Sequence, residues 1–258
     1  MLATPRLPIV RPLRRVVLLL LAPLAALLPL AAHAGTPGAN PAAVRFTIAM
    51  QAQGPDSSFS LSGDGVADMR GDVQLHMELN GPEQHSFDYI MAGGSAYISA
   101  DGAPFEVVTP GMGAMGGLDS SCLAMSSQGN LGDIGTLLGP SASVQNLGTE
   151  MLDGASVQHV RIHLDLASAV QALAPLLRQT LVGCGFSAGQ LGQLSSPEAQ
   201  DALAGSTLDL DAYVDTVNQF PRRLDLSIDA PAVPLSISMQ ETFTPLATPV
   251  AITPPAGF

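Results

Sequence analysis

Apolar and polar residues alternate strictly in several stretches of this chain. The first such stretch, VRFTIAMQAQ, begins at residue 44 and carries polar residues between its apolar ones. Its apolar side is formed by Val44, Phe46, Ile48, Met50 and Ala52. A period of two is typical of a β-strand that buries one side and exposes the other. Similar stretches recur about every 10 to 15 residues with turn residues between them, which predicts an antiparallel meander.

The next strands are expected to follow in close succession. The segment SFSLSGDGVADM turns Phe59 and Leu61 to the apolar side, and VQLHMELNG does the same with Val73, Leu75, Met77 and Leu79. The segment HSFDYIMAGGSAYIS, which carries Phe87 and Tyr89, predicts a hairpin that turns at Gly93 and Gly94. APFEVVTP is expected to be another short strand.

The middle of the chain has a different character. Residues 111–139 are rich in Gly, Met and Ser, follow no clear period, and are interpreted as a loop or lid with a short helix, LGDIGTLLG, behind it. SVQNLGTEMLDGASVQHVRIHLDL then predicts two paired strands that turn at Leu152, Asp153 and Gly154.

A helix is predicted where DLASAVQALAPLLRQTLVGC brings apolar residues to a spacing near 3.6. These residues are Val170, Leu173, Leu176, Leu177 and Leu181. Asp165 or Ser168 is suited to cap its first turn. Pro175 is expected to kink the helix or to divide it in two.

Alternation returns in the last third of the chain. Its apolar positions are Leu208, Leu210, Ala212 and Val214, then Leu224, Leu226 and Ile228, then Leu235, Ile237 and Met239. A bulge is expected to bring Phe243 to the same side, and the proline-rich tail is expected to be extended. The whole pattern predicts an α+β fold, in which helical segments after the middle interrupt a strongly twisted antiparallel sheet.

The first 34 residues are expected to be a cleaved signal peptide. They combine four arginines, an apolar run from Val16 to Leu30 and the cleavage pattern Ala32-His33-Ala34. The run contains two prolines and is shorter than the roughly 20 residues of a membrane-spanning helix. The expected organisation is therefore a signal peptide (1–34), a flexible tether (35–43) and a single domain (44–258), periplasmic or secreted. No cysteine stands near the cleavage site, so attachment as a lipoprotein is not expected.

Charge narrows the classes of partner. The chain has 10 arginines and no lysine against 22 acidic residues, and four of the arginines lie within the expected signal peptide. So acidic a protein repels phosphate backbones, which argues against binding to nucleic acid.

Cys122 and Cys184 are the only cysteines. In an oxidising compartment, an isolated pair most simply forms one disulfide, which would stabilise the fold by about 4 kcal/mol. Two unpaired buried thiols are the alternative.

The segment VQHVRIHLDL raises the question of a metal or catalytic site. On a strand, Val157, His159, Arg161, His163 and Asp165 share one side. His159 and His163 would then lie about 13 Å apart at ~3.3 Å per residue, too far to share one metal ion. We therefore interpret this side of the strand as a solvated face, and we expect no metal site here.

The segment GFSAG matches the nucleophile elbow of α/β-hydrolases, with Ser187 at its centre. That motif needs a histidine later in the chain, yet the histidines beyond the expected signal peptide, His76, His85, His159 and His163, all precede Ser187. We interpret the segment as a glycine-rich helix end and turn. With no phosphate-binding loop and no metal motif, neither a catalytic residue nor a cofactor is expected, and the protein is not expected to be an enzyme.

The order of segments resembles a known family. N-terminal strands, then GTEMLDGASVQHVRIHLDL and a helix, then STLDLDAYVDTVNQFPRRLDLSID and a PVAITPP end are similar to the LppX/LprG-type lipid-carrier proteins, which belong with the LolA-like periplasmic lipoprotein carriers. The resemblance implies a curved antiparallel half-barrel with helices covering its concave side, and an apolar cavity that binds acylated molecules. Many members are lipoproteins, and this chain departs from them by lacking the attachment cysteine.

An exported binding protein that shelters an acyl chain or another lipid for carriage across the cell envelope is therefore the expected function. The candidate contacts are Phe46, Ile48, Met50, Phe59, Leu61, Leu75, Met77, Phe87, Tyr89, Leu173 and Leu177. Residues 111–129 are the candidate gate. The alternative is a protein-binding or envelope-sensing module of the same fold that carries no lipid and recognises another envelope protein.

Overall fold

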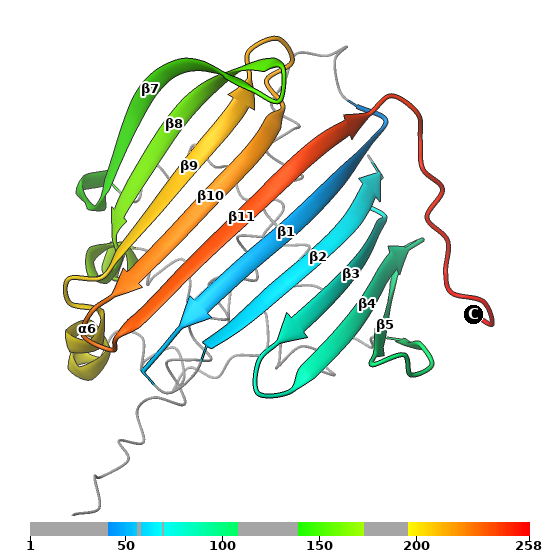
Figure 1. The fold of residues 1–258 in the computed structure, drawn as a ribbon, viewed down its shortest axis with the longest axis horizontal. Coiled ribbons are helices and arrows are strands. Elements are labelled where there is room, and N and C mark those ends of the chain that lie inside the picture. Colours follow the sequence, from blue (N-terminus) through cyan, green and yellow to red (C-terminus); the bar gives the residue numbers. More distant parts are fainter. Residues whose placement is uncertain (1–40, 56–57, 69, 108–138, 173–195) are drawn as a thin grey trace, which may run out of the picture.

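Eleven strands form one open antiparallel sheet in the computed structural model, which describes residues 41–55, 58–68, 70–107, 139–172 and 196–258. The strands are β1 (Ala43–Gln53), β2 (Ser58–Asp68), β3 (Val73–Asn80), β4 (Gln84–Ala92), β5 (Ser95–Ala100), β6 (Glu106–Val107), β7 (Ala142–Leu152), β8 (Ala155–Asp165), β9 (Thr207–Asp215), β10 (Pro221–Ala230) and β11 (Leu235–Leu246). The sheet is strongly twisted, as the alternating pattern predicts, and curved, as the family resemblance implies (Figure 1).

Strands β1 to β6 run in order from the centre of the sheet to one edge, and β7 to β11 run from the other edge back to the centre. The spatial order is β6-β5-β4-β3-β2-β1-β11-β10-β9-β8-β7, so the first strand pairs with the last. In Figure 1 the blue β1 and the red β11 lie side by side in the middle of the sheet. Every other pairing joins strands that follow each other along the chain.

Alternation assigns the two faces of the sheet. We call the face that carries Phe46, Ile48 and Met50 the inner face, and the opposite one the outer face. Val44, Phe46, Ile48, Met50 and Ala52 are buried, whereas Arg45, Thr47, Ala49, Gln51 and Gln53 are exposed. The buried core continues along the inner face through Leu224, Leu226 and Ile228 of β10 and through Ile237, Met239 and Phe243 of β11.

Two predicted hairpin turns are confirmed. Gly93 and Gly94 join β4 to β5 with φ of 59° and 80°, and Asp153 and Gly154 join β7 to β8 with φ of 50° and 80°. Positive φ at both central residues matches the twist of paired strands, which is why Gly-Gly and Asp-Gly favour such turns.

The start of the predicted helix is also confirmed. Residues 166–172 are helical, and the Ser168 N–H donates to the Asp165 carboxylate at 2.8 Å, so Asp165 caps the first turn. The remainder of that helix, with Pro175, lies outside the described residues.

Two short helical elements were not predicted from the sequence: η2 (Gly139–Ser141), a single 3₁₀ turn, and α6 (Pro197–Leu203). The start of α6 has recognisable signals, because Ser196 accepts from the Ala199 N–H at 3.2 Å and Pro197 occupies the first turn.

The expected bulge before Phe243 is wrong. The pairing of β11 with β1 runs without interruption from Leu246 to Ser236. Phe243 reaches the inner face by simple alternation, and the same alternation turns Glu241 inward. No bulge is needed, and regular alternation therefore places an acidic residue on the apolar face.

Core packing on the inner face can be tested at Leu226, whose side chain is almost fully buried between β9 and β11. Leu226→Ala is expected to lower the free energy of unfolding by about 2–5 kcal/mol, since it removes buried methyl groups and leaves a cavity. The neighbouring outer-face change Ser227→Ala should alter it by less than about 0.5 kcal/mol. Urea denaturation of both variants checks this, and equal effects would contradict the assignment of faces.

Candidate functional site

The strand pairing brings the predicted contact residues of β1 to β4 onto one surface. Phe46 lies in register with Gly65, Leu75 and Tyr89, and the next row toward the β1–β2 turn is Ile48, Gly63, Met77 and Phe87. Met50 pairs with Leu61, and Phe59 pairs with Ala52. All nine of these predicted residues therefore share the inner face. Their role as ligand contacts remains a prediction.

Burial divides this surface into two parts. The inner-face residues of β1, β10 and β11 are buried and form the core cluster. On β2, β3 and β4 the corresponding side chains are only half-buried: Phe59, Leu61, Leu75, Met77, Phe87 and Tyr89. We call these six side chains the apolar arm. It is the part of the predicted contact surface whose side chains stay partly exposed.

Two glycines of β2, Gly63 and Gly65, lie on the inner face beside the apolar arm. A Cβ atom added at Gly65 would lie 2.5 Å from Cζ of Phe46 and 2.7 Å from the Gln74 carbonyl oxygen. A Cβ atom at Gly63 would lie 2.6 Å from the His76 carbonyl oxygen. These positions have no room for a side chain, so the Phe46 ring packs directly over the β2 backbone.

Glu241 interrupts the apolar inner face. It lies in register between Ile48 of β1 and Leu224 of β10, and only 2% of its surface is exposed. Its Oε2 atom has no hydrogen-bond partner. Burial raises the pKa of Glu241 to about 8, because the charged form loses its hydration there. The protonated, neutral form of the side chain therefore predominates at pH 7.

A pH dependence of stability follows from this buried acid. Its pKa is 4.5 in the ordinary case and about 8 in the fold. Its neutral form is thus favoured in the folded protein, and stability falls by up to about 1.4 kcal/mol per unit as pH rises from 4.5 to 8. Glu241→Gln removes the titration, so the melting temperature of the variant should exceed that of the wild type increasingly from pH 5 to pH 8.

The exposed residue Glu106 supplies the control for this prediction. Glu106→Gln removes the same charge from a solvated position, and its difference from the wild type should not grow in that way. Thermal melts at several pH values make the comparison. A constant difference for Glu241→Gln would mean that Glu241 is ionised in the fold.

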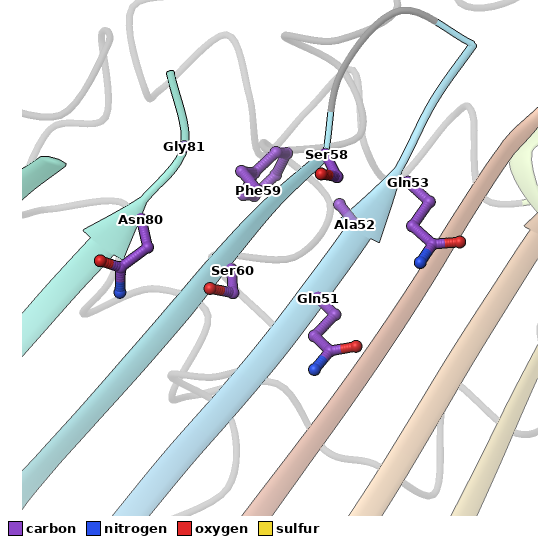
Figure 2. Close-up of a pocket in the computed structure, with 8 residues that line it drawn as sticks. All are labelled: Gln51, Ala52, Gln53, Ser58, Phe59, Ser60, Asn80 and Gly81. Carbon is purple, nitrogen blue, oxygen red and sulfur yellow. The ribbon is translucent and has the colours of Figure 1, made fainter. Parts of the chain in front are cut away.

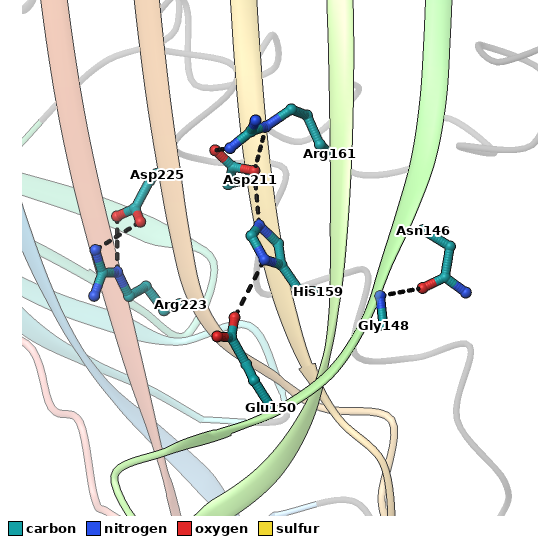
Figure 3. Close-up of polar contacts among 8 residues, drawn as sticks. All are labelled: Asn146, Gly148, Glu150, His159, Arg161, Asp211, Arg223 and Asp225. Carbon is teal, nitrogen blue, oxygen red and sulfur yellow. Dashed lines mark hydrogen bonds and ion pairs between the residues drawn. The ribbon is translucent and has the colours of Figure 1, made fainter.

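The outer face of β8 and β9 is polar, as the alternation of VQHVRIHLDL predicts. Figure 3 shows Asp211 between His159 and Arg161, with distances of 2.7 Å to the His159 ring Nε2 and 2.8 Å to the Arg161 Nε. Burial alone would raise the pKa of Asp211, but the hydrogen bonds from Arg161 and His159 outweigh it and lower that pKa below its usual range. Glu150 approaches the other nitrogen of His159 at 3.2 Å. The cluster joins neighbouring strands electrostatically.

The two histidines of this strand contact different partners. His163 Nδ1 lies 2.8 Å from the carboxylate of Asp209, whereas His159 contacts Asp211. Among the residues that the structure describes, no group of three or more His, Cys, Asp and Glu side chains is arranged to hold a metal ion. His76 similarly pairs with Asp88 at 2.8 Å, and this hydrogen bond raises the pKa of His76.

A hollow of about 360 Å³ lies where β1 and β3 end and β2 begins. Figure 2 shows that the amides of Gln51, Gln53 and Asn80 and the hydroxyls of Ser58 and Ser60 line it, with Phe59 and Ala52 nearby. Because five of its eight lining residues have polar side chains, this hollow does not have the chemistry of an acyl-chain site.

Several predicted features lie outside the described residues. They are the contacts Leu173 and Leu177, the cysteines Cys122 and Cys184, Ser187, the gate at 111–129 and the signal peptide. Within the described part of the chain, none of the helices combines the length and apolarity needed to cross a membrane.

No protein-family model and no curated protein matches the sequence. The chain is similar to the solved structure of lipoprotein LppX from Mycobacterium tuberculosis, with 16% identity and a TM-score of 0.40 over 91% of this chain and 98% of that one. It is also similar to LprF from Mycobacterium bovis, with 14% identity and a TM-score of 0.45 over 92% and 98%.

A further likeness is to the MucA/MucB complex of Pseudomonas aeruginosa, with 9% identity and a TM-score of 0.27 over 81% of this chain and 53% of that one. These structures thus include members of the LppX-type group that the sequence resembles. At such scores the likeness concerns the general arrangement of strands and says nothing about a ligand.

Proposed function

We propose that this protein is an exported carrier that shelters an acyl chain against the inner face of its sheet. The supporting observation is the apolar arm, the six large side chains of β2, β3 and β4 that share one face and remain half-buried. Large apolar side chains that stay partly exposed together on one face are typical of binding sites. The arginine-rich, apolar N-terminal segment supports passage into the cell envelope.

The physical basis of such carriage is reversible burial. Each methylene group exposed to water costs about 0.8 kcal/mol, so a long acyl chain does not cross an aqueous compartment unaided. A curved sheet with one apolar and one polar face removes this cost while the protein stays dissolved. The outer face provides the polar side, through residues such as Thr47 and Thr242, whose hydroxyls lie 2.6 Å apart. No covalent step is needed.

A charge placed in the apolar arm should abolish binding. Met77→Asp is expected to weaken the affinity for a fluorescent fatty acid at least tenfold, because the carboxylate would lose hydration beside the bound chain. Gln74→Asp adds the same charge to the exposed side of the same strand and is the control. Fluorescence titration of both variants checks this. Equal affinities in Met77→Asp and the wild type would refute the proposed site.

The edge strand β7 favours a second candidate function, the recognition of another envelope protein. It is exposed over nearly its whole length and pairs with β8 on one side alone within the described residues. Val144 and Met151 are 67% and 68% exposed. An unpaired apolar edge can accept an added strand from a partner. However, a bulge between Asn146 and Gly148 interrupts the edge, and such bulges commonly protect against pairing.

Mass spectrometry of the gently extracted protein separates the two candidates. An acyl lipid that remains bound in a fixed molar ratio supports the carrier. A lipid-free protein that instead retains one polypeptide, and loses it when Val144 and Met151 are changed to Lys, supports the recognition module.

A further inference from the structure

Glu241 has no role in packing that an apolar residue would not perform better. Burying a polar group without a partner is costly, and the great majority of buried polar atoms are satisfied. Glu241 nevertheless lies almost fully buried with Oε2 unpartnered, in the middle of the central strand pair. An orphaned buried group of this kind is explained when a ligand supplies the missing partner.

The surroundings of Glu241 define the chemistry of that ligand. In register beside it are Ile48 and Leu224, and the flanking inner-face positions are Phe46, Met50, Leu226, Met239 and Phe243. None of these side chains is titratable. Arg222 of β10, two residues before Leu224, is charged, but its guanidinium is paired with the Asp215 carboxylate at 2.8 Å. An apolar setting without a counter-charge favours the protonated acid, which can donate its O–H and suits a neutral oxygen acceptor.

The position of Glu241 relative to the apolar arm sets how such a ligand would lie. The row Met77, Gly63, Ile48, Glu241 crosses β3, β2, β1 and β11 on one face. Neighbouring strands lie about 4.8 Å apart, so Glu241 is about 10 Å from the Gly63 position, where no side chain stands above the backbone. A hydrocarbon chain on the apolar arm could therefore place its oxygen-bearing end at Glu241.

We propose that the Glu241 side chain is the polar anchor of the acyl site and donates a hydrogen bond to an ester or carboxyl oxygen of the ligand. This inference rests on the proposed carrier function and narrows its substrate class to lipids whose acyl chain ends in such an oxygen. A simple hydrocarbon would fill the apolar arm without engaging the anchor.

The test compares methyl dodecanoate with dodecane, which differ by the ester group, as competitors of the neutral fluorescent probe N-phenyl-1-naphthylamine. Glu241→Leu should weaken binding of the ester about fivefold to tenfold, the scale of one net hydrogen bond, and leave dodecane binding unreduced. Glu241→Gln retains a donor and should bind the ester within about twofold of the wild type. Gln240→Leu, which removes an amide from the outer face of the same strand, is the matched control.

A pH comparison gives an independent reading that does not depend on Glu241→Leu folding well. Ionised Glu241 cannot donate, so the wild type should lose ester affinity between pH 6 and pH 9.5 whereas Glu241→Gln should not. Two results would refute the role of Glu241 as the anchor without refuting the carrier function. One is an equal effect of Glu241→Leu on both ligands, and the other is a pH dependence of ester binding in Glu241→Gln equal to that of the wild type. Failure of both ligands to displace the probe from the wild type would refute the carrier function together with it.

Discussion

Antiparallel pairing of the first strand with the last is the contact on which the rest of the sheet depends. β1 pairs with β11 over its entire length and joins the meander β1 to β6 to the meander β7 to β11. Closing so long a stretch of chain costs entropy, which the buried row of Phe46, Met50, Met239 and Phe243 offsets. A slip of one residue would turn this row to solvent, so the buried face also fixes the register.

This central pair determines what each face can do. The polar outer face carries ion pairs between β8 and β9, such as Arg161 with Asp211, and keeps the sheet hydrated. The inner face is fully buried at its centre and half-buried over β2 to β4. This decrease in burial from the centre toward β4 supports the proposed carrier function, because a carrier needs a stable core and a partly exposed apolar surface on the same sheet. Glu241, the only buried acid of the described residues with an unpartnered oxygen, lies on β11 within the buried centre, two strands from β2.

Local pattern predicted much of this architecture, and its failures have physical causes. Strict alternation correctly predicted the strand that contains Phe46 and the side of that strand that is buried. The turn at Asp153 was recognisable because Asp-Gly favours positive φ. The pairing of β1 with β11 was not predicted, because alternation carries no information about which distant strands meet. The burial of Glu241 was not predicted, since a carboxyl group is seldom fully buried without a partner, although the apolar alternation on both sides of it was the available signal.

Photolabelling with a fatty ester that carries a diazirine at mid-chain tests the central claim most directly. If the inner face shelters the chain, peptide mapping should find the label on the half-buried residues of the apolar arm, such as Leu75, Met77 and Phe87, and excess unlabelled ester should prevent it. Labelling confined to outer-face residues such as Gln74, or no labelling that the unlabelled ester competes away, would contradict the account.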